Sequence, residues 1–158
     1  MKNSFLVLLV TLLVLASASA HAWTGQVVAV TDGDTIKVLQ DDRETKVRLY
    51  GVDTPEKKQA FGQKARDLTA SMVAGKVVDV EPVDLDRYGR TVGIVTVAGR
   101  SLNEELLKSG FAWVYRQYCH RGECSAWIME ESQARAARIG LWADPAPLPP
   151  WEWRRTKK

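Results

Sequence analysis

Three short β-rich runs follow one another early in the chain, with only a few turn residues between them. The runs are residues 25–31, 34–40 and 45–52. Asp32-Gly33 between the first two runs is a strong hairpin signal, and the polar residues 41–44 form the next turn. Connections this short join antiparallel neighbours, so we expect a meander of three strands. In a meander, the start of the second strand lies beside the end of the third.

The hydrophobic period changes after the third run. Four apolar residues recur at intervals of three and four, which places them on one face of a helix. They are Phe61, Ala65, Leu68 and Met72. The pattern predicts a helix from about Lys58 to Ala74, with Gly75 as its end.

The strand pattern then returns before a second helix. Residues 76–83 and 90–97 are β-rich, and the polar residues between them indicate a turn. Ser101, with Glu104 three residues later, forms a capping box at the start of a helix that ends at Gly110.

A short extended segment and a third helix complete the predicted elements. Residues 111–115 are apolar and aromatic, and residues 127–140 have a helical pattern. Glu131 and Arg135 are spaced for an ion pair on the helix surface. The side that we expect to face the domain carries Ile128, Ser132, Ala136 and Ile139.

Five strands interrupted by a helix after the third suit a small closed barrel. We therefore expect an α+β, mainly β, fold: a five-stranded OB-type Greek-key barrel with three helices. Residues 23–144 would form this domain. The Pro-rich, Trp-rich and basic tail, residues 145–158, is expected to be an extended strap that packs Trp151 or Trp153 on the domain. A basic arm that binds nucleic acid is the alternative for this tail.

The first 22 residues have the pattern of a secretory signal peptide. Lys2 precedes a short apolar run, and small residues offer cleavage after Ala20 or Ala22. The run is too short and wrongly flanked for a stable membrane anchor, which is the alternative. We therefore expect a secreted or periplasmic protein, soluble after cleavage and monomeric by default. Removing the one Lys of residues 1–22 lowers the net charge from +3 to +2, so binding to polyanions would need locally placed charge.

Both cysteines lie close together, at Cys119 and Cys124. In an exported protein this spacing favours a disulfide around a small loop. A zinc site that includes His120 is the alternative, but the chain offers too few soft ligands for a structural zinc. With His21 removed by cleavage, one His remains, so acid–base catalysis by two imidazoles is excluded.

Three polar motifs carry residues suited to catalysis, although each alone is also an ordinary turn. They are TDGDT at residues 31–35, RLYGVDTPE at 48–56 and DRYGR at 86–90. In the meander, Asp34 comes near Asp53 and Thr54. Two carboxylates and a loop carbonyl are hard oxygen ligands, suited to Ca²⁺ or Mg²⁺. Arg48 has the wrong strand parity to face the same site unless the chain bends near Gly51.

These groups together match a phosphoryl centre that is attacked by water. Arginines bind phosphate oxygens through two parallel hydrogen bonds and stay charged. Arg48 and Arg90 are the candidates for this role. Glu56 offers a free carboxylate to hold or deprotonate the water, and the Pro before it fixes its backbone.

The combination of these motifs resembles the staphylococcal nuclease (thermonuclease) family, from about Val27 to Trp142. The resemblance implies Ca²⁺-dependent hydrolysis of DNA and RNA that leaves 3′-phosphate ends. It implies metal ligation by the carboxylates of Asp34 and Asp53 and the carbonyl of Thr54. It implies that Asp32 supports these ligands without binding the metal itself. It also implies that Arg48 and Arg90 contact the scissile phosphate and that Glu56 activates the water. The residues expected to bind the rest of the substrate are Arg87, Tyr88, Tyr115 and Tyr118, the last two as candidates only because the Cys loop departs from the family pattern.

Two other functions are weighed against a nuclease. A barrel that only binds single strands would use the tyrosines and tryptophans, but it would not need Asp34, Asp53 and Glu56. A calcium-stabilised structural domain would explain the aspartates and leave Arg48 and Arg90 without a role.

Overall fold

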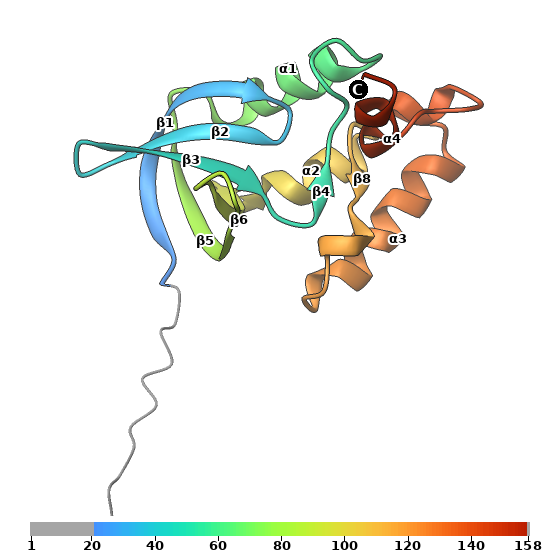
Figure 1. Cartoon of the computed structure of the whole chain (residues 1–158). Coiled ribbons are helices and arrows are strands. Elements are labelled where there is room, and N and C mark those ends of the chain that lie inside the picture. The colour runs from blue at the N-terminus through green and yellow to red at the C-terminus, as the bar shows by residue number, and fades with distance from the viewer. Residues whose placement is uncertain (1–20, 158) are drawn as a thin grey trace, which may run out of the picture.

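The predicted meander begins the fold in the computed structural model, which describes residues 21–157 (Figure 1). Its strands are β1 (Trp23–Asp32), β2 (Thr35–Gln40) and β3 (Arg43–Leu49). They pair antiparallel in sequence order. Thr35 at the start of β2 is paired with Arg48 near the end of β3, so the predicted neighbourhood of these two strand ends is confirmed.

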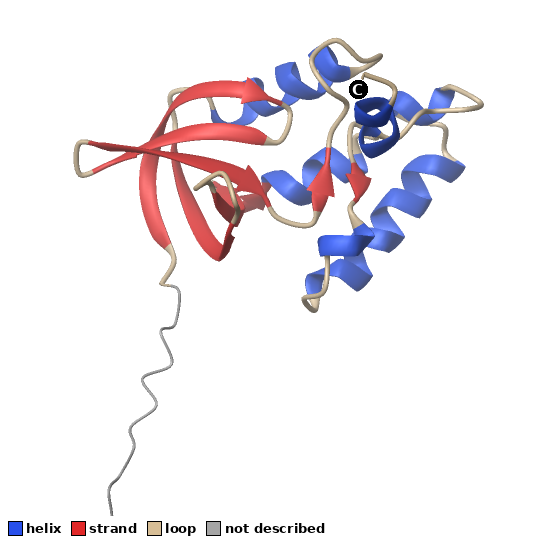
Figure 2. Ribbon diagram, viewed as in Figure 1, coloured by secondary structure: helices blue, strands red, loops and turns tan. Residues whose placement is uncertain are grey.

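The sheet closes on itself through two later strands. β5 (Val77–Leu85) pairs with β1 and with β6 (Thr91–Val97), and β6 pairs parallel with β3. A short strand, β7 (Arg100–Ser101), extends the sheet beyond β6. The expected five-stranded OB-type Greek-key barrel is confirmed, and its curved strands are red in Figure 2. Its buried interior includes Val27, Ile36, Val38, Val47, Val78, Val80 and Val95.

Helix α1 spans Gly62–Val73 and begins four residues later than about Lys58, where the sequence placed it. The preceding residue, Phe61, has a left-handed backbone (φ 65°), so the chain enters the helix through a tight loop. Gly62 packs so closely on that loop that a Cβ would lie 1.9 Å from the carbonyl oxygen of Glu56. The helix start therefore lies directly against the backbone of Glu56.

Helix α2 (Leu102–Lys108) has the predicted cap: the Ser101 hydroxyl accepts a hydrogen bond from the Glu104 backbone N–H at 3.3 Å. Its leucines are buried in the core. The Asn103 side chain donates to the Tyr50 carbonyl (2.9 Å) and accepts from the Val95 N–H (3.1 Å). The helix is thereby joined both to β6 and to the residue that follows β3.

Helix α3 (Glu123–Ala136) turns a different face to the domain from the one the sequence suggested. Its buried residues are Cys124, Trp127, Glu131 and Ala134. On the predicted face Ile128 is only half-buried, and Ser132, Ala136 and Ile139 are exposed. The Glu131–Arg135 ion pair is present, but its carboxylate is buried rather than on the surface.

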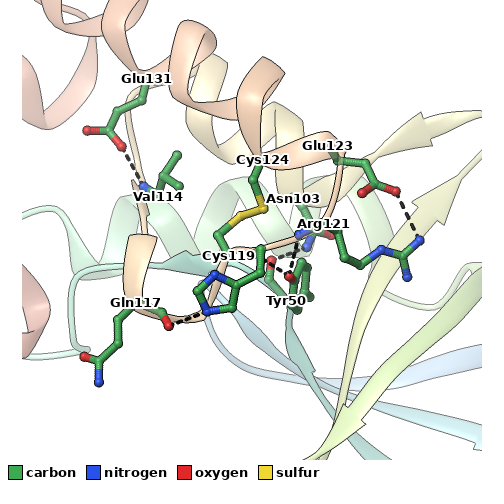
Figure 3. Close-up of a disulfide and its surroundings, with 10 residues drawn as sticks. Tyr50, Asn103, Val114, Gln117, Cys119, Arg121, Glu123, Cys124 and Glu131 are labelled. Carbon is green, nitrogen blue, oxygen red and sulfur yellow. Dashed lines mark hydrogen bonds and ion pairs between the residues drawn. A yellow bond between two sulfur atoms is a disulfide. The ribbon is translucent and has the colours of Figure 1, made fainter.

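A disulfide between Cys119 and Cys124 anchors the first turn of α3 (Figure 3). It joins the loop after the 3-10 helix Arg116–Tyr118 to the first turn of α3 and directs that turn inward. Because both thiols are in the disulfide, neither is available for the alternative zinc site. The Tyr50 hydroxyl accepts hydrogen bonds from two backbone N–H groups of the enclosed loop, at 2.8 and 3.2 Å.

The C-terminal tail is not extended to its end. A 3-10 helix at Gly140–Ala143 and a proline-rich loop lead to a fourth helix, α4 (Pro150–Arg155). Pro150 occupies the first helical position, where its fixed φ suits a helix start. The expectation that Trp151 packs on the domain is confirmed: it stacks on Tyr115 with 5.3 Å between ring centroids.

None of the helices within residues 21–157 is both long and apolar enough to cross a membrane. The predicted signal peptide lies outside the described residues, apart from His21 and Ala22.

Candidate active site

The chain bends sharply between Arg48 and Asp53, as the sequence required for the two to share a site. β3 ends at Leu49, and Gly51 has a left-handed backbone (φ +67°). The next strand, β4 (Val52–Asp53), leaves the barrel sheet and pairs with β8 (Trp113–Val114). In Figure 1 these two short strands lie between the barrel and α3. The bend therefore removes the objection from strand parity.

Arg48 joins the two aspartates that the sequence proposed as metal ligands. Its Nη1 donates to Asp34 Oδ1, and its Nη2 donates to Asp53 Oδ1 at 2.7 Å. Both carboxylates are buried, and Arg48 itself is 18% exposed. Thr54 completes the cluster, because its N–H and hydroxyl both donate to Asp34 Oδ2, at 2.9 and 3.0 Å. The structure thus brings together four of the predicted residues: Asp34 from the hairpin turn, Arg48 from β3, Asp53 from β4 and Thr54 from the loop after it.

The environment of each carboxylate shifts its pKa differently. For Asp34, burial favours the neutral form, but Arg48 and the hydrogen bonds from Thr54 outweigh it and lower the pKa. For Asp53, burial and the charge of Asp34 raise the pKa despite the neighbouring guanidinium groups. Burial and the proximity of Asp34 raise the pKa of Asp32 to about 7. Asp32 also accepts the backbone N–H of Asp34 at 3.2 Å, so it shapes the hairpin that carries this residue.

Glu56 is not the free carboxylate that the sequence suggested. Its Oε1 accepts a hydrogen bond from Arg154 Nη1 at 2.7 Å. The same guanidinium contacts Asp53, with Nη2 2.8 Å from Oδ2 and Nη1 3.3 Å from Oδ1. Arg154 lies on α4, about a hundred residues away in sequence, and it was missed because no motif or spacing connects the tail to Asp53. The basic character of residues 154–158 was the only signal available.

Arg90 is held in the turn between β5 and β6 by Asp86. The Asp86 carboxylate accepts the Arg90 Nε at 2.7 Å and the backbone N–H groups of Tyr88 and Arg90 at 2.9 and 3.0 Å. Although burial opposes it, these hydrogen bonds lower the pKa of Asp86. The turn presents Tyr88 with 68% of its surface exposed, and Arg87 donates to the Tyr88 hydroxyl at 2.7 Å.

These side chains surround one cleft of about 1050 Å³. Its lining includes Asp32, Arg48, Glu56, Arg87, Tyr88, Arg90, Tyr115, Tyr118, Trp151 and Arg154. Asp34, Asp53 and Thr54 are buried and do not line it. A second cavity of about 450 Å³ behind Trp151 contains none of the predicted metal ligands or phosphate-binding arginines, so the larger cleft is the candidate active site.

The buried residues beside Arg48 carry oxygen atoms of the type that Ca²⁺ prefers. Asp34 and Asp53 have carboxylates and Thr54 has a main-chain carbonyl, which are hard oxygen donors. Within residues 21–157 no three Asp, Glu, His or Cys side chains are grouped as a metal site. Water would therefore have to complete the six to eight ligands that Ca²⁺ usually takes.

A comparison with protein families identifies the family of the chain. Residues 46–144 match the model for staphylococcal nuclease homologues, and this segment carries Arg48, Asp53, Glu56 and Arg90. The chain belongs to the staphylococcal nuclease family. Membership of this family supports a nuclease activity, in agreement with the resemblance seen in the sequence motifs.

Several known proteins are similar to this chain over most of its length. A protein of Shigella flexneri described as micrococcal nuclease is 39% identical over 152 residues, covering 89% of this chain and 87% of its own length. An uncharacterized endonuclease of Haemophilus influenzae is 40% identical and covers 96% and 84%. Protein ParB of Escherichia coli is 43% identical and covers 90% and 85%.

Proposed function

We propose that the protein is an exported, Ca²⁺-dependent nuclease that hydrolyses phosphodiester bonds of DNA and RNA and leaves 3′-phosphate ends. The observation that carries this proposal is the position of Arg48, whose guanidinium lies between the buried carboxylates of Asp34 and Asp53 at the wall of the cleft. The two carboxylates are oxygen ligands suited to a metal ion, and the guanidinium between them is a fixed cation suited to a phosphate.

Calcium would be held by the carboxylates of Asp34 and Asp53 and the carbonyl of Thr54. When bound, it would neutralise negative charge on the phosphate oxygens. Asp32 supports this site from behind through its hydrogen bond to the Asp34 backbone.

Two arginines would bind the scissile phosphate. Arg48 and Arg90 line the same cleft, and each is partly exposed at 18% and 27%. Arg90 comes immediately before β6, and Val92 of β6 is paired with Arg48. Both arginines are therefore attached to neighbouring positions of the barrel backbone. Their planar guanidinium groups would donate hydrogen bonds to phosphate oxygens as charge develops there.

Glu56 would accept a proton from the attacking water. The water oxygen forms a bond to phosphorus, and the bond from phosphorus to the 5′ oxygen breaks. The phosphate remains on the 3′ oxygen, and the 5′ oxygen leaves as a hydroxyl after it takes a proton from solvent water. Glu56 lines the cleft and is 39% exposed, which leaves it accessible to water.

The remaining cleft residues would bind the nucleotides beside the cleaved bond. Tyr88 and Tyr118 are exposed aromatic rings, and base stacking on such rings tolerates any sequence. Arg87 would contact a phosphate beside Tyr88. Tyr115 already stacks on Trp151 and meets Tyr118 edge to face, so it would mainly support its neighbours.

Export and domain organisation complete the proposal. Residues 1–22 would be the signal peptide, 23–144 the nuclease domain and 145–158 its tail, with the mature protein secreted or periplasmic and monomeric. The Cys119–Cys124 disulfide supports an oxidising compartment.

One experiment separates a nuclease from a barrel that only binds single strands. Residues 23–158 are incubated with single-stranded DNA and with RNA, first with Ca²⁺ and then with excess chelator. We expect cleavage that requires Ca²⁺, and products that a terminal transferase extends only after treatment with a 3′-phosphatase. Binding without cleavage would support the binding module, and products extended without phosphatase would contradict the 3′-phosphate assignment.

A further inference from the structure

The C-terminal helix α4 is attached to the cleft at three separate places. Arg154 contacts Asp53 and Glu56, Trp151 stacks on Tyr115, and the loop before the helix is hydrogen-bonded to Gln59. In Figure 1 this C-terminal segment lies close to the loop that follows β4. The tail therefore forms part of the wall of the cleft.

We propose that Arg154 is a positioning residue, which holds the carboxylate of Glu56 in place relative to Asp53. The inference rests on the proposed function, in which these two residues serve as base and metal ligand. It concerns a residue that lies 98 positions from Glu56 and 101 from Asp53 and outside residues 46–144, which match the family model.

The hydrogen-bond geometry carries the first step. Arg154 donates two hydrogen bonds to the Asp53 carboxylate, at 2.8 and 3.3 Å, and Asp53 is fully buried. The nitrogen that makes the longer of these contacts, Nη1, is also 2.7 Å from Glu56 Oε1. One rigid, planar group thus fixes the flexible Glu56 side chain against an immobile carboxylate. Among the described residues, Arg154 is the one side chain bonded to the Glu56 carboxylate.

The attachment of α4 makes this contact rigid. Gln59 is buried, with 8% of its surface exposed, and its amide bonds in two directions. Its Oε1 accepts the Glu56 backbone N–H at 3.0 Å, and its Nε2 donates to the Leu148 carbonyl at 2.6 Å. Both the backbone and the carboxylate of Glu56 are therefore bonded to groups that the tail holds, and stacking of Trp151 fixes the helix start.

The charges around Arg154 predict a second, opposite effect. Four carboxylates and two guanidinium groups meet in this cluster, so two negative charges remain when all are ionised, which suits a divalent cation. They belong to Asp32, Asp34, Asp53, Glu56, Arg48 and Arg154. Arg154 bonds to the same Asp53 oxygens that would ligate the proposed cation. Its positive charge should therefore weaken Ca²⁺ binding, whereas its positioning of Glu56 should raise turnover.

The test measures these two effects separately in the mature protein. Arg154→Ala should bind Ca²⁺ about tenfold more tightly in calorimetric titration without substrate, a coupling of ordinary size between neighbouring sites. Its kcat should fall about a hundredfold with little change in KM, because a misplaced catalytic group costs about that much. Arg154→Lys keeps the charge but cannot span both carboxylates, so it should retain near-normal Ca²⁺ affinity and still lose most of the turnover. Lys157→Ala, an exposed cation just after the same helix, is the matched control and should change neither quantity.

The outcomes distinguish the positioning role from the proposed function. If the wild-type protein neither binds Ca²⁺ nor cleaves nucleic acid, the proposed function fails. If the wild type cleaves and Arg154→Ala retains its kcat, the positioning role is overturned. A joint loss of Ca²⁺ affinity, kcat and thermal stability in both Arg154 variants would show that the residue only stabilises the fold, which also overturns it.

Discussion

Replacing Gly51 by Ala tests whether the bend between Arg48 and Asp53 depends on this residue. The backbone there has φ +67°, and an L-residue with a side chain pays about 1–2 kcal/mol in that conformation. A Cβ would also lie 2.6 Å from the Sγ of Cys119 and 2.9 Å from the ring of Trp127. Overpacking of this kind costs about 1–3 kcal/mol, because neither the disulfide nor the buried ring can move freely. The free energy of unfolding should therefore fall by roughly 2–5 kcal/mol.

A matched control separates the two contributions. Gly75 has nearly the same backbone angle, φ +70°, but a Cβ there would meet no atom within 4 Å. Gly75→Ala should lose only the conformational part, about 1–2 kcal/mol. Urea unfolding with the disulfide intact measures both variants at equal ionic strength and without Ca²⁺. Equal losses in the two variants would refute the claim that Gly51 is required by close packing on the disulfide.

Three further predictions concern the cleft itself. Arg48→Lys and Arg90→Lys should each lower kcat about a hundredfold to a thousandfold, because one preorganised donor to developing charge is lost. The free energy of unfolding, followed by thermal melting, should change much less than the activation free energy. Near-normal turnover in both variants would contradict phosphate binding by these arginines. Glu56→Gln should keep its affinity for a single-stranded oligonucleotide, measured by fluorescence anisotropy in Ca²⁺, and lose turnover; a parallel loss of both would indicate a structural Glu56. In protein freed of Ca²⁺ by a chelator, the pKa of Asp32 is raised to about 7, so the folded state keeps a proton that the unfolded state releases near pH 4. The protonated carboxyl group therefore contributes to the free energy of unfolding. This contribution is complete below about pH 4 and is lost as the pH rises to about 7. Asp32→Asn should remove that loss, worth up to about 4 kcal/mol, and should therefore be more stable than the wild type at pH 8 but not at pH 4; the same stability difference at both pH values would contradict the shift.

The part of the site that is built by turns could be predicted from the sequence, because the residues that specify a turn are close together in the chain. Asp32-Gly33 fixed the hairpin, the hairpin fixed the register of β2 against β3, and the register placed Asp34 beside the end of β3. Even the bend at Gly51 followed from this reasoning, since Arg48 and Asp53 differ in strand parity. Each step used residues within about twenty positions of one another.

The contribution of the tail was not readable, because it depends on contacts across the whole chain. Nothing in the pattern of residues 145–158 specifies that Arg154 will meet Asp53. The helix at Pro150–Arg155 was likewise missed, because prolines and tryptophans in a short segment favour an extended chain on average. Stacking of Trp151 on Tyr115 supplies the tertiary contact that overrides this preference.

The wrong face predicted for α3 has a different cause, and it bears on the site. Residue type alone ranks Ile128 and Ile139 above Glu131 for burial, yet Glu131 is 2% exposed. Its carboxylate accepts the Val114 backbone N–H at 2.7 Å and the Arg135 Nε at 2.8 Å, so its burial is compensated. A buried polar group of this kind looks like an exposed one in sequence.

Glu131 connects α3 to the candidate active site without belonging to it. By binding Val114 it fixes β8, and Val114 is paired with Val52 in β4, the strand that ends in Asp53. The first turn of α3 is joined by the disulfide to Cys119, which lies close to Gly51, the residue before the same short strand. The helix is therefore connected to β4 in two ways: through β8, which pairs with β4, and through Cys119, which lies beside Gly51. Because Asp53 lies on this strand and is completely buried, these two contacts of α3 help to place its carboxylate.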